Sequence, residues 1–228
     1  MRRLAVAIGI WALLASPVAG APDDQVPVPE NYGQAMAWYE RAAEGGNAKA
    51  QFYLGVLLES GARVAADPAV AAGWFRKAAE QGHTEAQYRL GLMVFQGRGV
   101  GRDPSEAARW FEAAATGGLA DAQYNLGLMF ETGAGVGRDA ARAAGWYEKA
   151  ADQGIGGAQL QLSLMYARGK GVPRDPVRAL MWLEVALAGG LENRADYRNS
   201  LTVAMTPAQI EEAQQMARRH REGTRRAP

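Results

Sequence analysis

Apolar and polar positions along this chain repeat at a fixed interval of 36 residues. Around each repeated tryptophan, an alanine lies three residues before, an aromatic residue or leucine one residue after, and an alanine four residues after. These positions follow the i, i+3, i+4, i+7 spacing of one apolar helix face. A period of this length predicts an array of stacked structural repeats. Five of the six tryptophans mark the copies: Trp38, Trp74, Trp110, Trp146 and Trp182.

A second apolar stretch with helical spacing follows the first in each copy. It opens with Ala-Gln and an apolar residue, and a leucine follows the alanine by four residues, as in Ala50 and Leu54. Glycine separates the two stretches, for example at Gly46, because a residue just past a helix end readily adopts positive φ when it is glycine. Each copy is therefore predicted to form a helix A, a glycine turn and a helix B. We expect Gly55 and its counterparts to let helices approach closely, with tryptophan at the centre of the packing.

A glycine-rich loop and an aspartate close each unit. The loop reads G-x-G-V at residues 97–100, 133–136 and 169–172, and a degenerate copy occupies 61–64. Aspartate is a good helix N-cap, and proline follows it in three of four copies, at the favoured first helical position. A phosphate-binding loop would follow a strand and end in Gly-Lys-Ser/Thr, so a tight turn between repeats is the preferred interpretation. The recurring glutamines favour a packing or turn hydrogen bond over a ladder of ligands. The aspartates are Asp67, Asp103, Asp139 and Asp175, and the glutamines are Gln51, Gln87, Gln123 and Gln159.

Together these motifs resemble the Sel1-like repeat family, a relative of the tetratricopeptide repeats. The resemblance rests on A-x-x-W-[FY]-x-x-A-A-x-x-G, A-Q-[FY]-x-L-G and G-x-G-V-x-x-D over residues 31–190. Tetratricopeptide repeats have a period of about 34 residues and fit less well. The resemblance implies an all-α, right-handed α-solenoid of helix–turn–helix repeats. The fifth copy departs at Leu187 and Arg194, as terminal repeats do, and Thr206 and Pro207 then start an amphipathic C-terminal capping helix.

The N-terminal residues have the pattern of a cleavable signal peptide. Arg2 and Arg3 precede an apolar run of about 12 residues, too short to span a bilayer, and small residues lead to an expected cleavage after Gly20. An uncleaved anchor or a buried helix is the alternative. The expected organisation is a signal peptide at 1–20, a Pro-rich linker at 21–32 and a repeat array at 33–190, with about four full repeats plus the first helix of a fifth. Capping helices at 191–222 and a basic tail at 223–228 follow, and the mature chain is expected to be periplasmic or secreted.

The composition argues against several kinds of catalytic and metal-binding site. The chain has no cysteine, which excludes disulfides, thiol catalysis and cysteine-ligated metal. His83 and His220 are far apart and cannot form a multi-histidine zinc site, and His83 is interpreted as a solvated turn residue. The serines lack a nucleophile-elbow context. The formal charge of +1 becomes about −1 without residues 1–20, so no global charge favours nucleic acid. We therefore predict a non-enzyme with no cofactor and no metal.

Function is expected on the exposed side of helix A, which the family resemblance places on the concave face of the array. The positions two, three and six residues after each tryptophan vary between copies, and their mixed charge suits a protein or peptide partner. A plain solvated face is the alternative. The candidate partner-binding residues are Glu40, Arg41, Glu44, Arg76, Lys77, Glu80, Glu112, Thr116, Glu148, Lys149 and Asp152.

The resemblance implies a protein-interaction scaffold or adaptor of the cell envelope that regulates a signalling or assembly partner. The alternative is a protein that binds or hydrolyses cell-wall or β-lactam compounds. The mature form is expected to contain no integral membrane segment. The C-terminal arginines suit a solvated helix end, because cations are favoured there, but they also suit weak contact with an anionic membrane surface or an acidic partner. These arginines are Arg218, Arg219, Arg221, Arg225 and Arg226.

Overall fold

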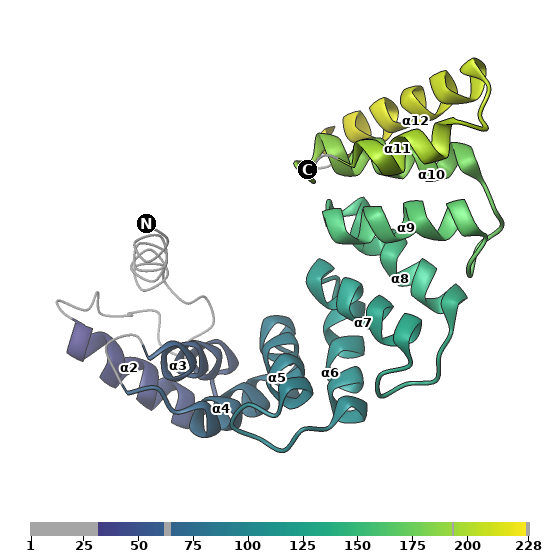
Figure 1. Cartoon of the computed structure of the whole chain (residues 1–228). Coiled ribbons are helices and arrows are strands. Elements are labelled where there is room, and N and C mark those ends of the chain that lie inside the picture. Colours follow the sequence, from purple (N-terminus) through teal and green to yellow (C-terminus); the bar gives the residue numbers. More distant parts are fainter. Residues whose placement is uncertain (1–31, 62–64, 193, 227–228) are drawn as a thin grey trace. The chain divides into compact units, whose positions relative to one another are not determined.

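The computed structural model describes residues 32–61, 65–192 and 194–226, with side chains for 36–61, 65–192 and 194–223. The predicted signal peptide, and the predicted linker up to residue 31, lie outside this range. The described residues form eleven α-helices and no strand, arranged as successive helix–turn–helix pairs (Figure 1). This confirms the predicted all-α solenoid fold class. The chain divides into two units, Met1–Arg102 and Asp103–Pro228.

The first unit contains two hairpins. Its A helices are α2 (Tyr32–Glu44) and α4 (Pro68–Glu80), and its B helices are α3 (Ala48–Ser60) and α5 (Thr84–Gln96). Each helix packs against the next one in the chain. This is the nearest-neighbour packing expected of a repeat array, in which no single hairpin buries its apolar face alone.

The second unit continues the same pattern and then changes it. The hairpins are α6 (Pro104–Thr116) with α7 (Ala120–Thr132), and α8 (Ala140–Asp152) with α9 (Gly156–Arg168). The helix A of the fifth repeat, α10 (Pro176–Ala188), is followed by a short α11 (Ala195–Thr202) with no buried residue.

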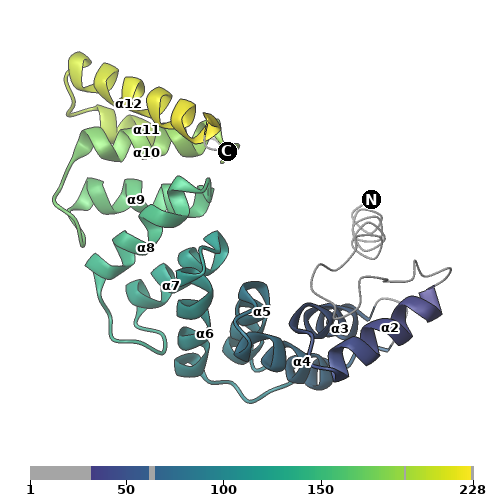
Figure 2. The ribbon, with the colours of Figure 1, turned by 180° about the vertical axis from the view of Figure 1, so that it is seen from behind.

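The last helix, α12 (Pro207–Arg226), packs against α10, and both views of the ribbon show the two helices together (Figures 1 and 2). Thr206 and Gln209 cap its start reciprocally: the Gln209 N–H donates to Thr206 Oγ1, and the Thr206 N–H donates to Gln209 Oε1. The helix runs past residue 222 through most of the predicted basic tail. Arginine has high helix propensity, and the next proline is Pro228.

The predicted helix-end signals are confirmed. In each copy an oxygen of the aspartate accepts N–H groups from the first helical turn, as Asp103 does from Ser105 and Glu106 at 2.9 and 3.0 Å. The second glycine of the G-x-G-V loop has positive φ, which is 74° at Gly135. A Cβ at Gly135 would overlap the carbonyl group of Pro104. The loop therefore packs directly on the start of the helix A of its own repeat, which confirms the interpretation as a structural turn.

The centre of the packing is the residue after the tryptophan. Phe75 and Tyr147 are fully buried, whereas four of the five repeated tryptophans are only partly buried. The expectation that the indoles form the centre is therefore wrong for all but Trp182, which is 4% exposed. One residue along a helix is a rotation of about 100°, and this turns the ring after the tryptophan toward the preceding helix B.

A small residue on helix B accommodates that buried ring. A Cβ at Gly127 would lie 2.7 Å from the ring of Tyr147, so only glycine fits at this distance. In the fifth repeat Leu183 of α10 replaces the ring. On α9, the preceding helix B, Ser163 occupies the position of the glycine. Its hydroxyl donates to the Ala179 carbonyl at 2.6 Å. Helices α7 and α8, and likewise α9 and α10, thus meet through matched pairs of residues.

The recurring glutamines make the same hydrogen bond in every hairpin. Each side-chain amide donates to a carbonyl in the last turn of its own helix A, for example from Gln123 to Ala115 at 3.1 Å. This confirms the prediction of a packing hydrogen bond. The other three bonds join Gln51 to Ala43, Gln87 to Ala79 and Gln159 to Ala151.

Candidate partner-binding surface

The eleven predicted partner-binding residues all lie on A helices, away from the packed seam. We call the positions two, three and six residues after each tryptophan the A face. Ten of these side chains are exposed, and Arg76 is partly buried. In the first unit they lie on α2 and α4, and in the second unit on α6 and α8. Because each helix A carries its seam on the opposite side, these positions present side chains to solvent without disturbing the core.

Lysines of the A face cover the partly buried indoles of their own helices. Lys77 Nζ lies 4.0 Å from the ring centroid of Trp74, and Lys149 Nζ lies 4.2 Å from that of Trp146. Residues three apart lie one turn apart on the same side of a helix, so the ammonium group reaches the ring face. The indoles thus form part of the outer surface, and the lysine stems extend the apolar area that a partner would meet.

Other A-face side chains contact residues outside the set. Glu112 pairs with Arg142 at 3.4 Å, and the same arginine lies 4.0 Å from the ring centroid of Phe130. Arg41 Nε donates to the Ala37 carbonyl at 3.1 Å. These contacts orient charged groups at the surface while leaving them accessible, since both members of the Glu112–Arg142 pair are more than half exposed.

The C-terminal helix reaches the end of this surface. His220 of α12 stacks edge-on against Trp182, with centroids 4.9 Å apart, and its Nε2 lies 3.9 Å from Asp152 on α8. Partial burial raises the pKa of Asp152, and the charge of His220 acts in the opposite direction. Trp182 is therefore covered by α12, in contrast to the indoles of the preceding repeats.

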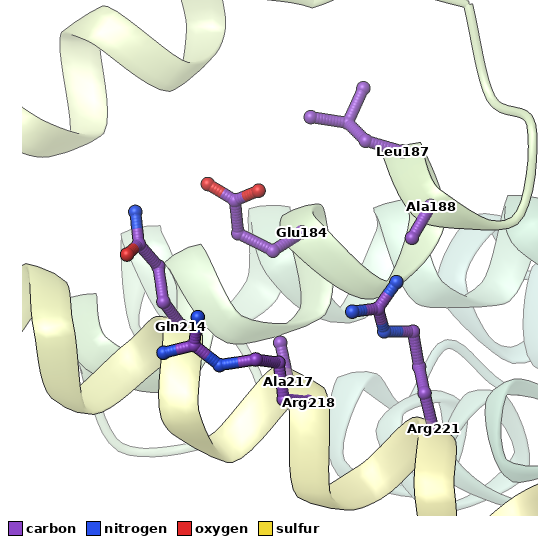
Figure 3. A pocket seen from close by; sticks show the side chains of 7 residues that line it. All are labelled: Glu184, Leu187, Ala188, Gln214, Ala217, Arg218 and Arg221. Carbon is purple, nitrogen blue, oxygen red and sulfur yellow. The ribbon is translucent and has the colours of Figure 1, made fainter.

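The pocket beside α12 includes A-face positions that were not selected from the sequence. It measures about 430 Å³, and Glu184 and Ala188, two and six residues after Trp182, contribute to its lining (Figure 3). The 36-residue period could have identified both. The contribution of α12 could not be anticipated, because the repeat pattern stops after Gly190. The full lining is Glu184, Leu187, Ala188, Gln214, Ala217, Arg218 and Arg221.

His83 is not the solvated turn residue that the sequence suggested. Its ring stacks on Phe52 with centroids 4.6 Å apart, and its Nδ1 accepts the Ala86 N–H at 3.4 Å as the N-cap of α5. Burial lowers its pKa, and Glu85 acts in the opposite direction. A turn position gives no sign of burial in sequence, because the covering ring comes from the preceding helix B.

A partly buried carboxylate network links two repeats of the second unit. Glu131 at the end of α7 accepts hydrogen bonds from Lys170 Nζ and Tyr147 Oη, both at 2.8 Å. Burial alone would raise the pKa of Glu131, but the bonds from Lys170 and Tyr147 outweigh it and the pKa is lowered. Burial and the bond to Glu131 raise the pKa of Tyr147. The network joins the loop after α9, and α8, to the end of α7.

Two properties of the described residues bear on the kind of site. They contain no group of three or more His, Asp or Glu side chains placed to hold a metal ion. None of the described helices combines the length and the apolar character needed to cross a bilayer.

Comparison with known proteins agrees with the repeat geometry. A family model described as Sel1 repeat matches residues 23–47, 48–83, 84–119, 120–155 and 157–191. A crystal structure of a Sel1 repeat protein from Oxalobacter formigenes is 35% identical, with a TM-score of 0.70 over 84% of this chain and 81% of that one.

A second crystal structure, of a protective antigen from uropathogenic Escherichia coli strains that displays an SLR fold, is 32% identical. Its TM-score is 0.53, over 86% of this chain and 50% of that one. No curated protein matches the sequence. With five repeat matches spread over most of its length, this chain belongs to the Sel1 repeat family.

Proposed function

We propose that this chain is a protein-binding scaffold or adaptor of the cell envelope whose A face engages a protein or peptide partner. Sel1 repeats generally mediate protein–protein interaction. One observation carries the proposal for this chain: most of the repeated alanines and the residue after each tryptophan are buried in the seam, whereas the residues that vary between copies are exposed along the A helices. A surface of this kind can be specific without affecting the fold.

The chemistry of the A face suits a polar and partly aromatic interface. Interfaces favour aromatic side chains and a polar rim, and the indoles of Trp74 and Trp146 with their covering lysines supply both. The exposed charges are of both signs, so a partner of mixed charge would bind in a defined register. The seam beneath is rigid, which lowers the entropic cost of binding.

The envelope location rests on the N-terminal sequence. A basic start, an apolar run and small residues at 17–21 support export. Cell fractionation followed by N-terminal sequencing of the mature protein tests this directly. We expect the protein in the periplasmic or secreted fraction with its first residue near Ala21. An intact Met1 in the cytoplasmic fraction would contradict the proposed location.

Partner binding is tested by crosslinking the full chain in its native cells, identifying the crosslinked protein and measuring its affinity for the purified chain. Glu148→Lys reverses an exposed A-face charge, and Asp121→Lys makes the same change on an exposed position of helix B in the same unit. We expect Glu148→Lys to change the affinity by about threefold or more, and Asp121→Lys to leave it unchanged.

Equal effects of the two substitutions would contradict binding through the A face. Turnover of peptidoglycan or of a chromogenic β-lactam by the purified protein would instead favour the alternative function.

A further inference from the structure

The pocket between α10 and α12 carries an excess of positive charge. Arg218 and Arg221 of α12 line it, and Figure 3 shows the guanidinium group of Arg218 beside Gln214 and that of Arg221 beside Ala188. Glu184 is the one acidic residue of the lining, and Arg198 Nε already donates to its Oε1 at 2.6 Å. The charge of Glu184 is therefore compensated by Arg198 of α11, and Arg218 adds an exposed positive charge to the lining.

The donors of α12 lie in a row suited to a carboxylate. Gln214, Arg218 and Arg221 are four and three residues apart, which places them on one side of the helix. A guanidinium group offers a planar fork of N–H donors that matches the two oxygens of a carboxylate. The rest of the lining is apolar, formed by Leu187 and Ala188 of α10 and Ala217 of α12. A short carbon stem that ends in a carboxylate fits this combination.

The entrance of the pocket is open to a folded partner. Ala188 and Arg218 are both exposed, so a side chain on the surface of another protein reaches the pocket without a free chain end. Glu184 and Ala188 also belong to the A-face positions of the fifth repeat, which makes the pocket continuous with the proposed binding surface on α10.

We propose that this pocket receives an aspartate or glutamate side chain of the protein partner. The inference rests on the proposed function and deepens it, because it adds the chemistry of one contact. The occupant carries its carboxylate against the guanidinium group of Arg218 and its aliphatic stem against Ala188 and Ala217. The partner therefore presents an acidic segment to the C-terminal end of the A face.

A defined probe tests the pocket without the natural partner. The probe is a peptide of alternating glutamate and alanine that carries an uncharged fluorescent dye and is acetylated and amidated, so that only side-chain carboxylates are present. The matched probe replaces every glutamate by glutamine. We expect the full chain to bind the glutamate peptide and not the glutamine peptide, with an affinity that falls as salt is raised.

Substitutions on α12 separate the pocket from general attraction by the arginine-rich helix. Arg218→Gln removes a lining charge, and Arg219→Gln removes the neighbouring exposed charge that does not line the pocket. We expect Arg218→Gln to weaken binding of the glutamate peptide by about fivefold, and Arg219→Gln to change it by less than about twofold. Ala188→Glu places a carboxylate at the entrance and should also weaken binding, while circular dichroism shows an unchanged helix content.

Three outcomes overturn the inference. The first is equal loss of affinity in Arg218→Gln and Arg219→Gln. The second is Arg218-dependent binding of a free C-terminal carboxylate but not of the amidated probe. The third is that the chain sediments with phosphatidylglycerol vesicles through Arg218 but does not bind the peptide. That result would show that Arg218 binds an anionic membrane surface and not an acidic partner.

These outcomes are distinct from failure of the proposed function. A natural partner that still binds through Glu148, with an affinity unaffected by Arg218→Gln, would leave the scaffold role standing and remove this contact from it.

Discussion

A single side-chain position links neighbouring repeats at the residue scale. Gln123 donates to its own helix A, and its Oε1 accepts a hydrogen bond from Gln153 of the next helix A at 2.8 Å. Gln51 and Gln81 repeat this arrangement in the first unit. The fifth repeat has Gly189 at the position of Gln81 and Gln153, and Gln159 Oε1 is buried with no hydrogen-bond partner among the described residues.

Gly189→Gln is therefore expected to stabilise the protein. Gly189 has φ −82° and Gln153 has φ −86°, so the new side chain needs no backbone change. A Cβ at Gly189 would lie 3.9 Å from Gln159 Oε1, close enough for the added amide to reach it. We expect a gain of about 1 kcal/mol, measured as a higher midpoint of urea unfolding. Gly189→Ala is the control for the backbone effect, and equal midpoints for the two variants would contradict the hydrogen-bond account.

The Glu131 network predicts a pH dependence of stability. The pKa of Glu131 is lower in the folded protein, so the network stabilises above the ordinary glutamate pKa of about 4.3, and this stabilisation is lost as pH falls through the lower folded pKa. Glu131→Gln should cost about 1–2 kcal/mol at pH 7 and less at pH 3, measured by thermal unfolding at both values. Glu148→Gln, an exposed control, should have no effect at either pH. A cost for Glu131→Gln that is the same at pH 3 and pH 7 would refute the network.

At the scale of the element, the contacts of α3 with α4 and of α7 with α8 depend on a match between a ring and a glycine. Tyr147 of α8 occupies the space that the missing side chain of Gly127 leaves on α7. Gly145, in the middle of α8, is exposed instead of packed. A Cβ at Gly145 would have no atom within 4 Å. The same substitution at these two glycines should therefore have opposite effects.

Gly127→Ala is expected to destabilise by about 1–3 kcal/mol, because the added methyl group displaces the buried ring. Gly145→Ala is expected to stabilise by about 0.5–1 kcal/mol, because alanine loses less entropy than glycine in a helix. Urea unfolding monitored by circular dichroism measures both. Similar stability of the two variants would show that the ring and the glycine are not closely packed.

The sequence predicted these elements well and their burial less well. Asp103, Pro104 and Gly118 mark the ends of helix A by capping chemistry that acts locally, so the boundaries could be predicted from the sequence. The burial of His83 by Phe52, and of Phe75 rather than Trp74, depends on how a neighbouring helix is oriented. Periodicity alone shows which side of a helix is apolar, but it does not show which residue on that side is deepest.

At the scale of the whole molecule, the 36-residue period predicts the helices up to α10. The period ends after Gly190, and the packing of α12 on α10 could therefore not be predicted from it. After Gly190 the sequence no longer repeats, and α12 rather than a full-length helix B covers α10. The pocket lined by Glu184 and Arg218 arises from this change and was not predictable from the motif. The candidate A face was predictable as exposed positions, because the same offsets from the first four tryptophans are polar everywhere except at Ala113.

The central claim is that a partner binds along the A face, and site-specific photo-crosslinking in native cells tests it most directly. Thr116 and Thr132 form a matched pair, since both are exposed and each is the last residue of its helix, one in helix A and one in helix B of the same repeat. A photoreactive residue replaces each threonine in turn. We predict a discrete crosslinked species from position 116 and none from position 132. Crosslinks from 132 alone, or equally from both positions, would contradict the claim.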